Sequence, residues 1–102
     1  MKALIDYSGR EIRLTDERAS HILEHSEMVG QESKIDETLL VPDIVITSKY
    51  DATVHLYHKF YHRTPVSEKF LMVAVKILDD DAFVITAFFI DKIKRGERIW
   101  PR

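Results

Sequence analysis

The chain has 102 residues, of which 45% are hydrophobic and 31% are charged, and it contains no cysteine. That length is typical of one domain, so we expect residues 1–102 to form a single domain. The composition excludes a disordered chain, and no apolar run approaches the roughly 20 residues that a membrane-spanning helix needs. The absence of cysteine excludes a disulfide, a thiolate nucleophile and a cysteine-based zinc site. We expect a globular protein of the cytoplasm that does not bind membranes.

The formal net charge of −2 argues against a protein whose whole surface binds nucleic acid, because such domains are usually basic. The charge is unevenly spread, however. Basic residues gather in segments 58–63 and 92–95, whereas acidic residues gather at 79–81 and in the predicted helices. A local positive patch is therefore compatible with a mildly acidic chain.

The first 40 residues predict a hairpin followed by two helices. Segment 3–14 has two short apolar runs around the turn residues Ser8 and Gly9. Thr15 or Asp16 is expected to cap a first helix, which Gly30 ends. Ser33 and Asp36 have the spacing of a capping box, and they predict a second helix that runs to Leu40, before Pro42.

From residue 44 onward the pattern is that of β-strands. We expect four antiparallel strands, at 44–48, 53–61, 70–78 and 82–90, while segment 92–102 is basic and weakly patterned. The predicted fold class is therefore α+β, with N-terminal short strands and two helices packed on a C-terminal antiparallel sheet.

Within this sheet the polar residues are informative. A hairpin centred on Asp80 would pair Lys76 with Val84 and Ala74 with Thr86, and would place Lys76, Ala74 and Thr86 on one face. The helices would dock on the opposite face, which would carry Val73, Val75, Ile77, Phe83, Ile85 and Phe89. The same pairing puts His58 on the Lys76 face and Tyr57 on the other, although a slip of one residue would exchange these two.

His21 and His25 are spaced by four residues, which places them on one face of a helix. Imidazoles are suited to general acid–base catalysis near neutral pH. The segment also matches the H-x-x-E-H pattern of some zinc peptidases, but the chain offers neither the third ligand nor the further helix that such a site requires. The alternative is that both histidines are ordinary surface residues.

Three further features have both a functional and a structural interpretation. Lys76, in an apolar strand, would stabilise a phosphate or simply extend to solvent, and Thr86 would hold a phosphate oxygen or only favour the strand. Segment 55–63 alternates aromatic and basic residues, which suits single-stranded RNA as well as an edge strand. The basic segment 91–96, with Lys92 and Arg95, would be a phosphate clamp or a solvated tail.

Several of these segments together resemble a known family. They are 13–18 with His21 and His25, 56–61, 70–76, 83–88 and 91–94, and their order and spacing are similar to those of the small phage-associated nucleases with the barnase/EndoU/colicin/RelE-like fold. The chain departs from the family pattern at His58, where an aromatic residue is expected, and at Phe88, where a tyrosine is expected.

The resemblance implies RNA cleavage without a metal ion or other cofactor. A base would activate the ribose 2′-hydroxyl, an acid would protonate the leaving oxygen, and a cation would stabilise the phosphate. The resemblance assigns His21 and His25 to acid–base catalysis, Lys76 and Thr86 to the phosphate, and Tyr57 to base stacking. His58, Lys92 and Arg95 would also bind substrate, and an antitoxin would be a natural protein partner. The alternative is a non-catalytic module that binds protein or RNA.

Overall fold

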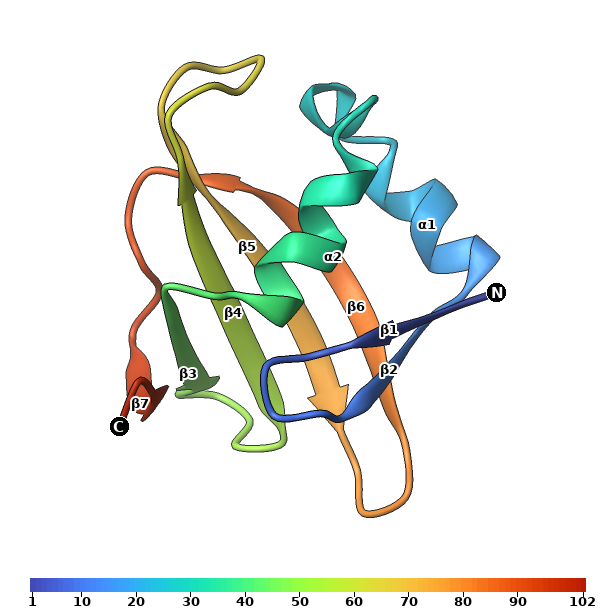
Figure 1. The fold of residues 1–102 in the computed structure, drawn as a ribbon, viewed down its shortest axis with the longest axis vertical. Coiled ribbons are helices and arrows are strands. Elements are labelled where there is room, and N and C mark those ends of the chain that lie inside the picture. Colours follow the sequence, from blue (N-terminus) through green and yellow to red (C-terminus); the bar gives the residue numbers. More distant parts are fainter.

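A seven-stranded mixed sheet with two α-helices on one of its faces forms the fold in the computed structural model, which describes residues 1–102 (Figure 1). The strands lie in the order β1-β2-β6-β5-β4-β3-β7. Their bounds are β1 Lys2–Ile5, β2 Glu11–Leu14, β3 Ile44–Ser48, β4 Val54–Tyr61, β5 Lys69–Ile77, β6 Ala82–Ile90 and β7 Gly96–Trp100. The helices are α1 Asp16–Ile22, the 3₁₀ turn η1 Ser26–Met28 and α2 Glu32–Leu40. The predicted α+β class is confirmed.

The hydrophobic core lies between the helices and the sheet face that they cover. Ile22 of α1, Met28 of η1 and Ile35 and Leu39 of α2 pack there against alternate residues of the strands. Tyr57 of β4 and Leu71, Val73 and Val75 of β5 are fully buried on this face. We call this side the helix face, and the opposite side the open face. No helix of the structure is long and apolar enough to cross a membrane.

The four predicted C-terminal strands, β3 to β6, pair antiparallel as expected. The sequence did not predict that the N-terminal hairpin extends this sheet and makes it mixed. The N-terminal hairpin joins β6 through β2, and Arg13 and Phe83 pair there in parallel. At the other edge, the chain leaves β6 and crosses to the far side of the sheet, where β7 pairs with β3 (Figure 1). The sequence did not predict β7, because most of its residues are exposed and lack an alternating apolar pattern.

The first helix ends at Ile22, well before the predicted Gly30. Beyond it, the backbone forms i to i+3 hydrogen bonds, including Glu24 N–H to His21 O and His25 N–H to Ile22 O. The burial of Met28 explains the break. In a continuous α-helix, residue 28 would point about 120° away from Ile22, yet both side chains are buried in the core.

The capping box predicted for the second helix is also wrong. The N-cap of α2 is Gln31, and no side chain caps it. Asp36 instead accepts a hydrogen bond of 2.9 Å from the ammonium of Lys2, which connects α2 to β1. The charge at position 36 therefore serves a tertiary contact rather than the start of the helix.

The predicted hairpin register is correct in its upper half and wrong in its lower half. Ala74 pairs with Thr86 as expected, but a bulge then shifts the register, so that Val75 pairs with Val84 and Lys76 with Phe83. An inserted residue in one strand reverses the faces of the residues beyond it. Phe83 consequently lies on the face of Lys76, opposite to the prediction.

Candidate nucleic-acid interface

The open face is built from rows of side chains that the strand register brings side by side. His58 of β4, Met72 of β5 and Phe88 of β6 form one row. The next row holds Leu56, Ala74 and Thr86, and the row after it holds Val54, Lys76 and Phe83. The face is mostly apolar and half-buried, so its few polar groups stand out.

His58 lies in this face but is completely buried. Its Nδ1 atom lies 3.0 Å from the carbonyl oxygen of Leu56, and its Nε2 atom accepts a hydrogen bond of 3.2 Å from the backbone N–H of Lys94. This pair of contacts fits a neutral ring with the proton on Nδ1. Burial lowers the pKa of His58 to about 4, and Lys94 adds to the effect. His58 therefore fixes the segment between β6 and β7 against the sheet.

Lys94 is placed by this contact above the row of Phe88. Its ammonium lies 6.0 Å from the centre of the Phe88 ring. The imidazole of His25 approaches the same ring, with the ring centres 5.5 Å apart. Phe88 is thus an aromatic side chain between an exposed lysine and a half-buried histidine.

A cavity of about 360 Å³ lies beside this group. It is lined by Ser48, Lys49, Tyr50, Leu56, Lys94 and Arg95, and no acidic side chain lines it. Tyr50 is 87% exposed, and the ammonium of Lys49 lies 5.0 Å from the centre of its ring. The three cations form no ion pair within the chain.

Lys76 is on the open face, as the sequence predicted, but its ammonium is engaged. It forms an ion pair of 2.8 Å with Asp51 of the β3–β4 turn. The hydrogen bond from Lys76 is the main cause that lowers the pKa of Asp51, and Thr53 contributes further hydrogen bonds. Lys76 is about a third exposed and would have to exchange this partner for a ligand.

The two histidines of the first helix do not lie on one helix face, because the helix ends between them. His21 is on α1, exposed, with its Nδ1 atom 3.6 Å from Glu24. His25 lies beyond the helix end and contacts Phe88. No group of three or more histidine and acidic side chains is placed to hold a metal ion.

The structure separates His25 from Lys76. The row of Phe88, which His25 contacts, and the row of Lys76 lie four residues apart along β5, and this spacing corresponds to about 13 Å. Thr86 lies between them on the same face. The structure therefore does not bring His25 and Lys76 together. Thr86 lies in the row next to the one that His25 contacts.

The remaining predicted ligand residues divide between the two sides of the sheet. Tyr57 is on the helix face with no exposed surface, so its ring is not free to stack on a base. Its hydroxyl donates a hydrogen bond of 2.6 Å to Asp6. Lys92 and Arg95 are exposed on the segment that crosses the open face, and Arg95 lines the cavity described above.

Sequence reasoning missed Lys49 and Tyr50, because a turn with one lysine and one tyrosine has no distinctive pattern. Lys94 was visible only as part of a basic run. These residues are recognisable as one site only in the folded protein, where the β6–β7 connection lies against β4 and brings Lys94 to the cavity with Lys49 and Tyr50. The comparison with known proteins adds no assignment: no protein-family model, no curated protein and no solved structure matches the chain.

Proposed function

We propose that the protein binds single-stranded RNA on the open face of its sheet. The observation that carries this proposal is the cavity lined by Lys49, Lys94 and Arg95, three unpaired cations on a chain of net charge −2. Tyr50 and Phe88 add rings next to these cations. Cations for the backbone and rings for the bases are what single-stranded nucleic acids require.

The contribution of the cations can be measured through the salt dependence of binding. Each phosphate contact to a single strand contributes about −0.7 to the slope of log K against log salt concentration, so three contacts give a slope of about −2. Titration of a fluorescein-labelled oligouridylate, followed by anisotropy at several salt concentrations, is the direct measurement. We expect Lys94→Ala to reduce the slope by about 0.7 and to weaken binding several-fold.

The matched control is Lys34→Ala, which removes one cation from α2 on the helix face. It is expected to leave the affinity and the salt slope close to those of the unaltered protein. Equal losses in the two variants would contradict the proposal, because they would show a diffuse attraction rather than binding on the open face. Absence of any binding at low salt would overturn it.

RNA cleavage is a second candidate, and the position of His25 favours it. The imidazole forms no hydrogen bond within the chain and contacts Phe88, whose row on the open face is next to that of Thr86. A free imidazole is suited to remove the proton of a ribose 2′-hydroxyl, and Thr86 would contact the phosphate. Lys76 would act only after it separates from Asp51.

Cleavage is tested with end-labelled RNA in the presence of EDTA. The expected products appear with RNA but not with a strand that carries 2′-deoxyribose at every position. His25→Ala should abolish them, whereas His21→Ala should not, since His21 is exposed and faces Glu24. Binding without cleavage by the unaltered protein would leave the binding function and remove the catalytic one.

A further inference from the structure

A second cavity, of about 570 Å³, lies on the helix side of the sheet, between the β1–β2 turn and the end of β7. It is separate from the open face, because His55, which lines it, and Leu56, which lines the first cavity, point to opposite sides of β4. Its lining includes Arg10, His55, Arg102, Ser8, Tyr7 and Trp100. This volume is in the range of small-molecule sites.

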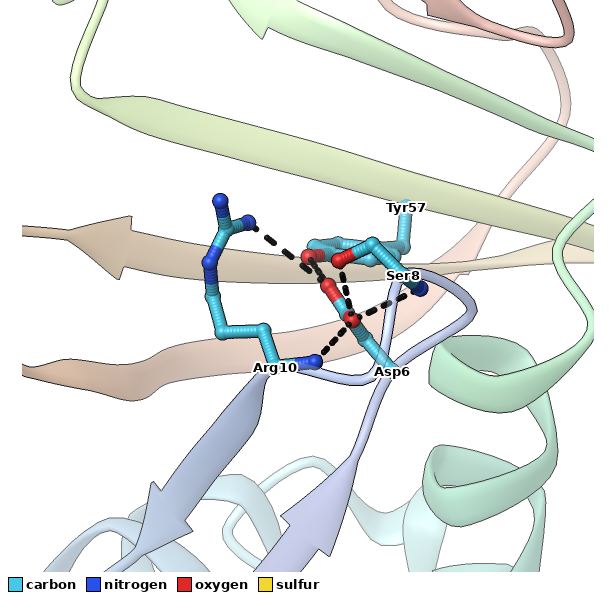
Figure 2. Close-up of polar contacts among 4 residues, drawn as sticks. All are labelled: Asp6, Ser8, Arg10 and Tyr57. Atoms are coloured by element: carbon cyan, nitrogen blue, oxygen red, sulfur yellow. Dashed lines mark hydrogen bonds and ion pairs between the residues drawn. The ribbon is translucent and has the colours of Figure 1, made fainter.

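The cavity is cationic. Arg10 and Arg102 line it, and no acidic side chain does. The nearby carboxylate of Asp6 is fully buried, and Figure 2 shows that the side chains of Ser8, Arg10 and Tyr57 converge on it. Asp6 already accepts hydrogen bonds from the Tyr57 hydroxyl, the Ser8 hydroxyl and the backbone N–H groups of Ser8 and Arg10.

The guanidinium of Arg10 is therefore only partly used by Asp6. Its Nη1 atom lies 3.7 Å from the Asp6 carboxylate, which is an ion pair without a close hydrogen bond, and its side chain is 39% exposed. The planar donors of a guanidinium match the oxygens of a phosphate. Arg10 can thus contact an anion in the cavity while Asp6 orients its stem.

His55 is half-buried and lines the cavity, and one of its ring nitrogens has no hydrogen-bond partner. Its Nδ1 atom is buried and has no partner within the chain. Burial lowers the pKa of His55, and the charge of Arg10 adds to this effect. An anion bound between His55 and the arginines would raise the pKa of His55 and favour the charged form of the ring, which donates from both nitrogens.

The cavity also has an aromatic wall. The rings of Tyr7 and Trp100 are stacked, with their centres 4.8 Å apart and their planes at 28°. Trp100 is 37% exposed, so part of the indole faces solvent. Tyr7 supports the indole from one side, and a planar group can stack against what remains open.

We propose that this cavity binds a nucleoside monophosphate unit, with its phosphate at Arg10, His55 and Arg102 and its base on Trp100. The two parts of the ligand correspond to the two parts of the lining, a cluster of cations and an exposed indole. The unit belongs either to a free nucleotide or to the phosphorylated end of an oligonucleotide. The proposal does not depend on RNA binding at the open face.

Trp100 is the only tryptophan of the chain, so its fluorescence reports on this cavity alone. The experiment titrates the protein with adenosine monophosphate and follows the quenching of Trp100. We expect saturable quenching, at least tenfold weaker binding of adenosine, and at least tenfold weaker binding of inorganic phosphate. Absence of saturable quenching up to about 5 mM nucleotide would overturn the proposal, because a dissociation constant above that concentration corresponds to very weak binding.

Arg102→Gln and Arg10→Gln are each expected to weaken the binding of adenosine monophosphate at least tenfold. Arg102 forms no hydrogen bond or ion pair within the chain, so its substitution does not threaten the fold. Arg63→Gln, in the exposed β4–β5 loop, is the control and should bind as the unaltered protein does. If all three variants bound adenosine monophosphate with equal affinity, the assignment of its phosphate to Arg10 and Arg102 would be contradicted.

The source of the ligand is decided by two oligonucleotides of the same sequence, one with a 5′-phosphate and one with a 5′-hydroxyl. Quenching by the phosphorylated oligonucleotide at lower concentration than by adenosine monophosphate would assign the cavity to an RNA end. Quenching by the free nucleotide alone would assign it to a mononucleotide. Both results support the same chemistry at Arg10 and Trp100, whereas equal quenching by the two oligonucleotides would exclude a role for the terminal 5′-phosphate and contradict the assignment of the cavity to a phosphorylated end.

Discussion

The Nε2 atom of His58 accepts a hydrogen bond of 3.2 Å from the backbone N–H of Lys94. This bond joins the middle of the sheet to the segment that crosses its open face. It also requires a neutral imidazole, because a protonated ring has no acceptor. The position of the cations in the proposed RNA interface therefore depends on the protonation state of a buried histidine.

Acid is expected to destabilise the protein through His58. The pKa of His58 is about 4 in the folded protein, whereas the ordinary value for histidine is 6.5. The unfolded state therefore binds more protons than the folded state between these pH values. Stability that is fully present above pH 6.5 is lost as the pH falls toward 4. Urea unfolding at pH 7 and pH 5 should show a decrease on the order of 1–2 kcal/mol from this residue.

The comparison variant for that measurement is His58→Phe, which cannot titrate. Its stability should change less between pH 7 and pH 5 than that of the unaltered protein. The difference between the two proteins isolates His58 from His55, whose pKa is also lowered. An identical pH dependence in both would show that His58 is not the group that titrates.

The hydroxyl of Tyr57 is expected to stabilise the fold without a role in RNA binding. Its hydrogen bond of 2.6 Å to Asp6 ties β4 to the N-terminal turn, and both residues are buried (Figure 2). Burial and Asp6 raise the pKa of Tyr57, so the hydroxyl stays protonated and donates. Tyr57→Phe should lower the free energy of unfolding by about 1–3 kcal/mol, measured in urea.

Tyr50→Phe is the matched control, because Tyr50 is exposed and its hydroxyl forms no hydrogen bond within the chain. We expect no change in stability from that substitution. A loss in Tyr57→Phe that is no larger than in Tyr50→Phe would show that the Asp6 contact contributes little.

Asp51 is expected to restrain Lys76 on the open face. Asp51→Asn removes the ion-pair partner of the lysine and frees its ammonium for a phosphate. RNA affinity, measured by anisotropy, should rise a few-fold. The gain should disappear in the double variant Asp51→Asn with Lys76→Met.

Asp16→Asn controls for the general effect of one lost negative charge. Asp16 is exposed on α1 and is paired with the N-terminal ammonium, so its removal also frees a cation, but at the β1 edge of the sheet rather than beside Lys76. An equal gain in this variant would mean that the overall charge, rather than Lys76, determines the affinity.

The four strands between residues 44 and 90 could be predicted from sequence because each is an apolar segment with its own boundaries. The prediction of 44–48 and 82–90 agrees with β3 and β6, and His58 and Tyr57 lie on opposite faces as expected. The fold could not be predicted where a single tertiary contact decides the backbone. The break after Ile22 depends on Met28 reaching the core, and the face of Phe83 depends on one bulged residue.

The candidate sites were less accessible to sequence reasoning than the fold. Lys94 is placed by His58, and Tyr50 is placed by the turn that Asp51 and Thr53 stabilise. The second cavity joins residues from the first ten positions to His55 and to residues from the last four positions. Contacts between residues so far apart in the chain leave no pattern in a single sequence, because the residues next to each of them do not depend on the contact.

Gly96 is expected to be intolerant of any side chain, because the backbone of β3 occupies the space that a Cβ atom would need. A Cβ atom at Gly96 would lie 1.8 Å from the carbonyl oxygen of Thr47, far inside van der Waals contact. Gly96→Ala should therefore separate the start of β7 from β3 and lower the free energy of unfolding by about 2 kcal/mol or more. Because β7 also carries Trp100, the emission of that residue should change, and its quenching by adenosine monophosphate should weaken.

Gly30→Ala provides the comparison. Gly30 has a φ of +79° but no atom within 4 Å of the added Cβ, so only backbone strain is expected. Its cost should be about 1 kcal/mol, with unchanged Trp100 emission. If Gly96→Ala left the emission of Trp100 and its quenching unaltered, β7 would not be the element that forms the second cavity, and the nucleotide site would lose its aromatic wall.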